Sequence, residues 1–529
     1  MRILPWAGIS GIALLTLIPL AVVAASVLHP DPVIWQHLRA FVLPELLLNT
    51  VWLVLGVGLG VLLLGVSTAW LTAACEFPGR RLFEWALLLP LALPAYISAF
   101  VWLGLFDVTG SVSLWLREMG IVLPPVRSRG GIILLLSLSL YPYVFLTARA
   151  AFLGQGARLL EAAQSLGLSR RQAFWRVALP LARPGIVAGL ILALMETLAE
   201  FGAVSIFNYN TFTTAIYKAW FGLFSLTTAS QLASMLVFFV LIALLVEGQM
   251  RARRHYAATT RAGDKPLRWR LHGASALAAS SWCGLVLFFA FLLPMGQIVG
   301  WAWGVGSADL DSRYWGFAAH SLWLGGLGTV CVLALAIALG YAQRLNPGAG
   351  MRLMTRLATL GYAMPGAVLA VGLFIPLAWL DNQWINAGLT QAPVLQGSIM
   401  VMLLAYAARF MAVGFNPIEA GLTRISPRID EAAALHGVTG LARLWRVHLP
   451  MLRVSVLTAA ALVFVDILKE LPITLMTRPF GWDTLAVRVF EMTSEGEWER
   501  AALPALAIVV VGLLPVWLLT KGQDHAIAC

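Results

Sequence analysis

The sequence predicts an all-α polytopic membrane protein with about twelve transmembrane helices, arranged as two parallel repeats of six helices. Three observations predict this: the composition, a series of apolar segments long enough to cross a bilayer, and two related polar segments 270 residues apart. Of the 529 residues, 60% are hydrophobic and only 12% are charged, and the mean hydropathy is +0.84. A soluble globular protein is nearer half apolar and one quarter charged. The chain therefore has more apolar surface than a water-soluble fold could bury.

A helix needs about 20 mainly apolar residues to cross the hydrocarbon core. By that criterion the expected spans are 7–28, 50–74, 86–106, 131–152, 186–205, 231–248, 273–300, 321–343, 358–380, 397–415, 454–470 and 503–520. The small residues of AVVAAS (21–26) would suit cleavage of a signal peptide. The apolar run is longer than a usual signal core, so we expect the first helix to be retained as an anchor.

The distribution of basic residues orients these spans. If the N-terminus is cytoplasmic, 24 of the 36 Lys and Arg residues fall in cytoplasmic segments and nine in outer loops, and Arg149, Arg409 and Lys469 fall at or within helix ends. This asymmetry follows the positive-inside rule, which explains the net charge of +11 without a nucleic acid partner. Both termini are then expected in the cytoplasm, and the basic segment 251–272 becomes a cytoplasmic linker that touches anionic headgroups or only sets the topology.

An internal duplication divides the chain. Between 161–183 and 431–453, ten of 23 positions are identical, and the same offset of 270 relates residues in the helices that follow. Six spans in each half give the two repeats the same orientation, with a pseudo-two-fold axis along the membrane normal. The expected units are a first repeat, 1–250, the linker, 251–272, and a second repeat, 273–529.

The repeated segment predicts two short helices on the cytoplasmic side. Gly167 is suited to the left-handed residue that ends the first helix, and Ser169 with Gln172 forms a capping box for the second. We expect Pro180 to limit that second helix. The other copy has Gly437 and Thr439 at the matching positions but lacks the glutamine of the box.

Both copies fit the pattern EAA, three residues, Gly, nine residues, an aliphatic residue, any residue, Leu-Pro. This resembles the loop of bacterial ABC importer permeases (type I), in which it docks into a separate cytoplasmic ATPase. The resemblance implies an ATPase-coupling role for eight residues: Glu161, Ala162, Ala163, Gly167, Glu431, Ala432, Ala433 and Gly437. None of the four lysines follows a glycine, so the chain has no P-loop and is not itself an ATPase. ATP and Mg²⁺ are expected on the partner, present as two copies, and no cofactor is expected on this chain.

Three further stretches suggest a cargo. ETLAEFG, TFTTAIYKAWF and DILKELP resemble segments of the ferric-iron permeases of the binding-protein-dependent class, and the likeness extends over nearly the whole chain. Glu200 stands where that family more often has aspartate. The residues agree with this resemblance, because ionisable side chains within spans usually face a bundle interior or a water-filled cavity. Glu196 and Glu200 in the first half, and Asp466 and Glu470 in the second, are the candidate translocation path. The alternative is that Glu200 and Glu470 cap backbone or pair with basic residues.

Other candidate sites are fewer. Lys218 and Arg488 are expected on the outer face, where they could contact a periplasmic substrate-binding protein or lie at the membrane interface. The four cysteines have no CxxC spacing and the eight histidines form no HExxH, so no stable metal site is predicted.

The main hypothesis is therefore a ferric-iron permease of an ABC importer in the bacterial inner membrane. The alternative within the class is a permease for thiamine or another small solute. From other classes, an ion-coupled secondary transporter would explain the acidic residues but not the repeated loop, and a membrane anchor without a pathway would leave those acidic residues unexplained.

Overall fold

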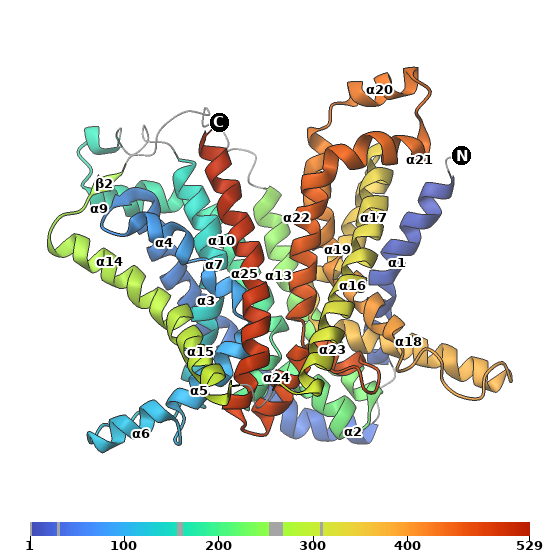
Figure 1. Cartoon of the computed structure of the whole chain (residues 1–529), viewed down its shortest axis with the longest axis horizontal. Coiled ribbons are helices and arrows are strands. Elements are labelled where there is room, and N and C mark those ends of the chain that lie inside the picture. Colours follow the sequence, from blue (N-terminus) through green and yellow to red (C-terminus); the bar gives the residue numbers. More distant parts are fainter. Residues whose placement is uncertain are drawn as a thin grey trace.

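The computed structural model describes residues 3–28, 32–155, 161, 163–252, 268–306 and 310–528. Within them almost every element is helical, and both termini of this part of the chain lie at the same end of the molecule as helix α20 (Figure 1). Ala162 and most of the linker, 253–267, lie outside the described residues.

The first half begins with a long N-terminal helix and ends in α13. Its elements are α1 (Ile3–Ala25), η1 (Ser26–Leu28), α2 (Pro32–His37), η2 (Leu38–Val42), α3 (Leu43–Ala74), β1 (Cys75–Glu76), α4 (Arg80–Ala86), η3 (Leu89–Ala92), α5 (Ala95–Phe106), α6 (Ser111–Glu118), α7 (Arg129–Leu153), α9 (Arg170–Ala173), η4 (Phe174–Ala178), α10 (Leu179–Ala199), α11 (Gly202–Ile206), α12 (Phe212–Tyr217), η5 (Lys218–Gly222) and α13 (Leu226–Ala252).

The second half repeats this order. Its elements are β2 (Trp269–Arg270), α14 (Ala274–Leu287), η7 (Phe288–Leu292), α15 (Leu293–Val305), α16 (Ser312–Leu345), α17 (Ala349–Thr359), η9 (Leu360–Ala363), α18 (Gly366–Asn386), α19 (Ile399–Arg424), α20 (Pro427–Leu435), α21 (Gly440–Arg443), η10 (Leu444–His448), α22 (Leu449–Leu468), α23 (Pro472–Thr477), α24 (Leu485–Ser494) and α25 (Trp498–Ala528).

Eleven helices within the described residues are long and apolar enough to cross a membrane. They correspond to the first eleven expected spans, which confirms the all-α polytopic class. The twelfth expected span, 503–520, lies within α25, whose side chains are described only as far as Leu513.

Each half is built on the same three-helix core. In the first half α3, α7 and α10 pack against one another, and in the second half α16, α19 and α22 do the same. Small residues allow these helices to approach closely: a Cβ on Gly65 would lie 2.7 Å from Val144 Cβ, and one on Gly414 would lie 2.8 Å from Val332 Cγ1. Such close packing is how helices associate in lipid, where apolar burial alone offers little drive.

The two halves interlock. Helix α1 of the first half packs on α17 and α18 of the second, while α14 and α15 of the second half contact α3 and α5 of the first. A short parallel strand pair adds a further link, with Cys75 of β1 opposite Trp269 of β2 at the end of the linker. Each half therefore completes its packing with elements from the other.

The spans expected as continuous at 86–106 and 358–380 are broken. In the first, η3 is followed by extended Leu93 and by Pro94, the N-cap residue of α5. In the second, η9 is followed by Met364 and by Pro365, the N-cap residue of α18. Proline disfavours helical backbone in the residue before it, which explains the break. The expected span 186–205 is also interrupted, because α10 ends at Ala199 and α11 begins at Gly202.

Candidate functional site: a central cavity and two loops

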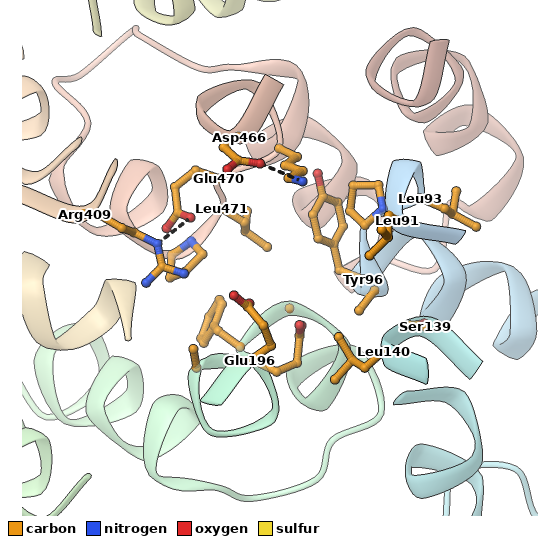
Figure 2. A pocket seen from close by; sticks show the side chains of 18 of the residues that line it. Leu91, Leu93, Tyr96, Ser139, Leu140, Glu196, Arg409, Asp466, Glu470 and Leu471 are labelled. Atoms are coloured by element: carbon orange, nitrogen blue, oxygen red, sulfur yellow. Dashed lines mark ion pairs between the residues drawn. The ribbon is translucent and has the colours of Figure 1, made fainter. Parts of the chain in front are cut away.

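Broken helix ends from both halves meet around one cavity of about 150 Å³ (Figure 2). The first half contributes the start of α5 and the turn from α10 to α11, and the second half contributes the turn from α22 to α23 and part of α19. All four carboxylates singled out from the sequence line this cavity: Glu196, Glu200, Asp466 and Glu470. Broken helices that line a cavity at the interface of two repeats are a common arrangement in transporters.

Two glycines let the broken ends approach closely. A Cβ on Gly202, at the start of α11, would lie 2.6 Å from Cβ of Tyr96. A Cβ on Gly366, at the start of α18, would lie 2.6 Å from Oε1 of Glu470. Larger residues at either position would push these turns apart, so the local sequence sets the shape of the cavity.

Glu200 and Glu470 occupy equivalent turns and make equivalent backbone contacts. Glu200 Oε1 accepts a hydrogen bond of 2.8 Å from the N–H of Ala203, and Glu470 Oε1 accepts one of 3.2 Å from the N–H of Ile473. Each carboxylate therefore caps the short helix that follows it, α11 or α23. Backbone capping was one of the alternatives that the sequence left open for these residues, and it occurs at both of them.

The carboxylates of the second half also have cationic partners. Arg409 Nε lies 3.3 Å from Glu470 Oε2, and both side chains are buried. Arg409 also donates a hydrogen bond to the carbonyl of Met364, in the break before α18. Lys469 Nζ lies 2.8 Å from Asp466 Oδ1. These pairs hold the α22–α23 turn against α19 and the α18 break.

Several lining residues were not identified as site residues from the sequence. Arg409 was treated as lying at or within a helix end, yet it faces the cavity from within α19. An arginine inside an apolar span is by itself a sign of function, and that signal could have found it. Tyr96, Tyr143 and Tyr362 also line the cavity. Nothing in their local sequence marks them, because buried tyrosines are common in helical cores.

The carboxylates do not form a preformed metal cage. Within the part of the chain that the structure describes, no three His, Cys, Asp or Glu side chains lie close enough together to hold a metal ion. The arrangement can attract a cation into the cavity without enclosing it.

The described part of the first repeated loop has the expected local structure from Gly167 onward. Ser169 caps α9, and the capping box with Gln172 is present. Gly167 has φ of +85°, in the left-handed region that favours glycine. Glu161 is exposed and Ala163 is buried, so the motif presents its acidic residue to solvent. Ala162 is the motif residue that lies outside the described residues.

The second repeated loop forms α20 and α21 at one end of the molecule (Figure 1). Glu431 and Ala432 are exposed on α20, and Ala433 is buried. Gly437 follows with φ of +74°, and Thr439 makes no side-chain cap, in accord with the missing glutamine. One large apolar side chain protrudes from each loop, Leu166 at 84% exposure and Leu435 at 89%.

The expectation that Pro180 limits the second short helix was wrong. The helix continues from α9 through a π-helical turn, Phe174–Ala178, into α10, where Pro180 lies in the first turn. A first-turn proline needs no N–H donor within the helix, and the π turn accommodates its ring. The second copy does the same through Leu444–His448 and Pro450. Each loop is therefore joined rigidly to the span that ends at the cavity.

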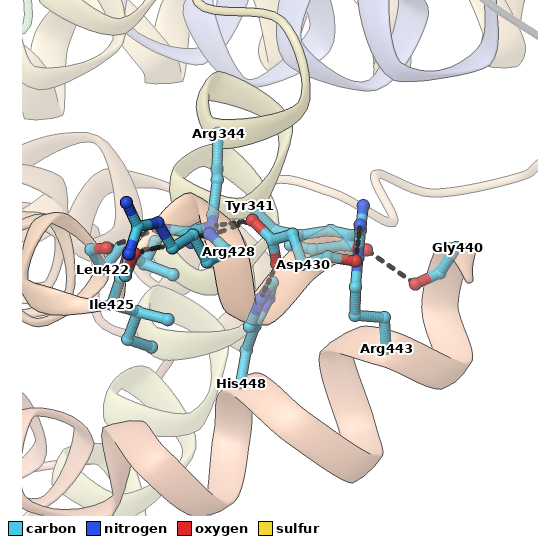
Figure 3. Close-up of polar contacts among 10 residues, drawn as sticks. Tyr341, Arg344, Leu422, Ile425, Arg428, Asp430, Gly440, Arg443 and His448 are labelled. Carbon is cyan, nitrogen blue, oxygen red and sulfur yellow. Dashed lines mark hydrogen bonds and ion pairs between the residues drawn. The ribbon is translucent and has the colours of Figure 1, made fainter. Parts of the chain in front are cut away.

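A polar cluster anchors the second loop (Figure 3). Asp430 on α20 contacts Arg344 at the end of α16, with Oδ2 2.8 Å from Nη2, and it accepts a hydrogen bond of 2.6 Å from His448 Nε2. Arg344 also donates to the carbonyls of Leu422 and Ile425, at the end of α19. Burial alone would raise the pKa of Asp430, but the hydrogen bonds from His448 and Arg344 and the charge of Arg344 outweigh burial and lower the pKa below its usual value.

Aromatic contacts anchor the first loop instead. The ring of Trp70 on α3 lies 4.7 Å from Phe174 and 5.5 Å from Trp269, measured between centroids. The Arg170 guanidinium of α9 lies 5.9 Å from the centre of the Trp269 ring. The end of the linker therefore packs beneath the first loop, whereas charged groups hold the second.

Lys218 and Arg488 lie far from both loops in sequence and make local contacts. Lys218 is exposed and donates a hydrogen bond of 2.7 Å to Asn210 Oδ1. Arg488, on α24, lies 3.6 Å from Glu491 and stacks over Phe317. In Figure 1, α24 lies at the end of the molecule opposite α20.

Comparisons with known proteins agree with this architecture. The model of the family described as binding-protein-dependent transport system inner membrane component matches residues 62–252 and, a second time, residues 332–521. The Fe(3+)-transport system permease protein FbpB 2 of Haemophilus influenzae is 28% identical over 486 residues, 90% of this chain and 90% of that protein. The sulfate transport system permease protein CysT of Escherichia coli is 34% identical over 140 residues, 26% of this chain and 50% of that protein. The molybdenum transport system permease protein ModB of Escherichia coli is 33% identical over 146 residues, 28% of this chain and 63% of that protein.

Proposed function

The chain belongs to the family of binding-protein-dependent transport system inner membrane components, and on this premise we propose that it is the permease through which an ATP-driven importer moves ferric iron. It is a multi-pass membrane protein and a transport component, not an enzyme in itself. The two family matches correspond to the two halves that surround the cavity.

The observation that carries the cargo proposal is the charge of the cavity. Four carboxylates and two basic side chains, Arg409 and Lys469, line it, so the formal charge of the lining is negative. Ferric iron is a hard cation that favours oxygen ligands. The likeness to an Fe(3+)-transport permease over 90% of the chain supports the same cargo.

The sulfate and molybdenum relatives raise the possibility of an anionic cargo, but they cover only about a quarter of the chain. A dianion would enter a cavity that already holds an excess of carboxylates, which like-charge repulsion opposes. Thiamine or another small solute remains the alternative cargo within the family. An ion-coupled secondary transporter is set aside, because the family works with a binding protein rather than alone.

The two repeated loops are the proposed sites of ATPase docking. Each presents an exposed glutamate, Glu161 or Glu431, and a protruding leucine, and each is continuous with a span that ends at the cavity. We expect one ATPase subunit on each loop, with ATP and Mg²⁺ bound there and no cofactor on this chain. Closing of the ATPase pair would favour one orientation of the halves and so shift the population between outward-open and inward-open states.

The remaining assignments follow from the orientation of the protein in the membrane. If α20 faces the cytoplasm, the N- and C-terminal ends lie there too, and α24 faces the periplasm (Figure 1). Lys218 and Arg488 are then proposed contacts for acidic groups of a periplasmic substrate-binding protein. Charged contacts of this kind speed encounter more than they tighten binding.

The test is uptake by proteoliposomes that contain the permease, its ATPase and its binding protein. Radiolabelled ferric iron, sulfate, molybdate and thiamine are offered separately, with and without ATP inside. ATP-dependent uptake of iron alone is expected. Uptake of thiamine or of an oxyanion in place of iron would overturn the cargo proposal, and uptake without ATP would overturn the importer mechanism.

A further inference from the structure

The pseudo-two-fold symmetry of the central cavity is broken in its charges. The offset of 270 that relates Glu470 to Glu200 also relates Arg409, the partner of Glu470, to Ser139. The same offset relates Asp466 to Glu196. It also relates Lys469, which pairs with Asp466, to Ala199. Both Ser139 and Ala199 line the cavity. The acidic residues are therefore duplicated in the first half, whereas their cationic partners are not.

As a result, the two halves differ in net charge. In the second half each carboxylate has a basic side chain within 3.3 Å. In the first half neither Glu196 nor Glu200 forms an ion pair among the described residues, although both line the cavity; the charges of Arg409 and Lys469 act on Glu196 only from beyond ion-pair distance. Both carboxylates are half-buried, so their charges are only partly solvated, and a cation arriving in the cavity would be attracted to them.

A third group of the first half points into the same space. The Tyr96 side chain is 4% exposed, and its hydroxyl has no hydrogen-bond partner among the described residues. Figure 2 shows the ring projecting into the cavity from the start of α5. Buried hydroxyls are normally hydrogen-bonded, so one that no protein atom satisfies in a polar cavity is available to a water or an ion. At the matching position, 271 residues later, the second half has Ala367.

We propose that the first half alone supplies the seat for a hard cation, formed by the carboxylates of Glu196 and Glu200 and the hydroxyl of Tyr96. The second half forms a charge-compensated wall in which Arg409 and Lys469 hold Glu470 and Asp466 in place. This inference deepens the proposed function, since it names the side of the cavity that receives the transported ion.

The chemistry of the seat suits transit. All three groups offer oxygen, the donor that hard cations prefer. Two carboxylates and one hydroxyl leave several coordination positions for water, so the ion is not fully dehydrated. Conduction requires binding that is strong enough for entry and weak enough for release. The opposite wall, with its two fixed cations, would keep the ion from being shared among four carboxylates.

The experiment measures binding separately from transport. Terbium(III), a hard trivalent ion, is titrated into the detergent-solubilised permease and followed by its sensitised luminescence. The paired substitution Glu196→Gln with Glu200→Gln is expected to weaken terbium binding by about tenfold or more, because affinity follows the number of charged oxygen ligands. Tyr96→Phe removes one neutral oxygen ligand, so it is expected to weaken terbium binding by less than the loss of both carboxylates. The double substitution Asp466→Asn with Lys469→Gln removes an ion pair without changing the net charge. It is expected to weaken terbium binding less than Glu196→Gln with Glu200→Gln. Glu118→Gln, an exposed carboxylate on α6, is the control for the substitution itself.

Iron uptake by the same variants in proteoliposomes supplies the second readout, and co-purification with the ATPase shows that each variant is assembled. The inference is overturned if the variant with Glu196→Gln and Glu200→Gln binds terbium as tightly as the wild type. It is also overturned if the variant with Asp466→Asn and Lys469→Gln loses as much terbium affinity as the first-half variant. If the wild-type permease binds terbium at Glu196 and Glu200 but takes up no iron, the seat stands and the ferric-iron proposal fails. If iron is taken up but the first-half substitutions leave terbium binding unchanged, the ferric-iron proposal stands and the proposed seat fails.

Discussion

His448 Nε2 lies 2.6 Å from Asp430 Oδ1, and this contact joins the second loop to the π-helical turn that precedes α22. His448 is fully buried, and Asp430 belongs to the helix that carries Glu431. Because α22 runs without interruption from this turn to Leu468, next to the cavity, a displacement of α20 would be transmitted along a rigid element. The first half has Ala178 at the position of His448, so it lacks this connection.

Replacing His448 with alanine is expected to loosen the coupling between ATP hydrolysis and transport. The substitution leaves Asp430 with its contacts to Arg344 and Arg443 but removes its shortest contact to the π turn that precedes α22. The ATPase should still co-purify, while the ratio of ions transported to ATP hydrolysed falls severalfold. Ala178→Ser, at the matching position of the first half, is the control. An unchanged ratio with His448→Ala would show that the contact does not transmit motion.

Acidification is expected to weaken the same cluster. The pKa of Asp430 is lowered in the folded protein, so its stabilising contribution is complete above the usual aspartate pKa of about 3.9 and is lost as the pH falls through the lower folded value. The groups that face Asp430 are His448, Arg344 and Arg443. Asp430→Asn should lower the free energy of unfolding by about 1–3 kcal/mol at pH 7. Thermal unfolding in detergent should show this difference shrinking below pH 4, and a difference that grows instead would contradict the assigned direction.

Replacing Gly437 with valine is expected to distort the turn between α20 and α21. The residue has φ of +74°, and open space surrounds its missing Cβ, so the cost comes from backbone strain rather than from a clash. Left-handed backbone costs a non-glycine residue roughly 1–2 kcal/mol. Co-purification of the ATPase should fall, and Gly167→Val should act in the same way. Gly222→Ala, a glycine with open space and no left-handed backbone, is the matched control.

Removing the Arg409 charge is expected to destabilise the central cavity. Arg409→Gln leaves Glu470 buried without its cation, which typically costs about 3–5 kcal/mol. The double substitution Arg409→Gln with Glu470→Gln should recover most of that loss, because it removes both charges. Thermal stability of the purified permease gives the coupling energy of the pair. Equal losses in the single and double variants would mean that the guanidinium acts through its bond to Met364 instead.

The topology can be tested through the linker. Single cysteines at positions 255–265, which lie outside the described residues, should react with a membrane-impermeant reagent only from the cytoplasmic side. The positive-inside pattern is the basis for this expectation. Labelling from the periplasm would invert the orientation and, with it, the sides assigned to α20 and α24.

Much of the architecture could be predicted because it is encoded locally or by repetition. Apolar segments of about 20 residues identify spans wherever the chain places them. The glycine and capping residues of the loops act on their own turns, and Gly167 and Ser169 behave as expected. The breaks at Pro94 and Pro365 were missed, because a span was predicted from the apolar composition of about 20 residues, in which a single proline changes little.

The sequence by itself determined that this is a membrane protein of two like-oriented halves, each with the same loop and the same acidic pair, because hydropathy and internal repetition are properties of the chain alone. Only the tertiary structure decided which acidic residues are neutralised. Glu470 pairs with Arg409, 61 positions away along the chain, and Tyr96 packs against the turn that follows Glu200, where Gly202 leaves room for it. Contacts of this kind depend on where distant helices end in space, and no local pattern records that.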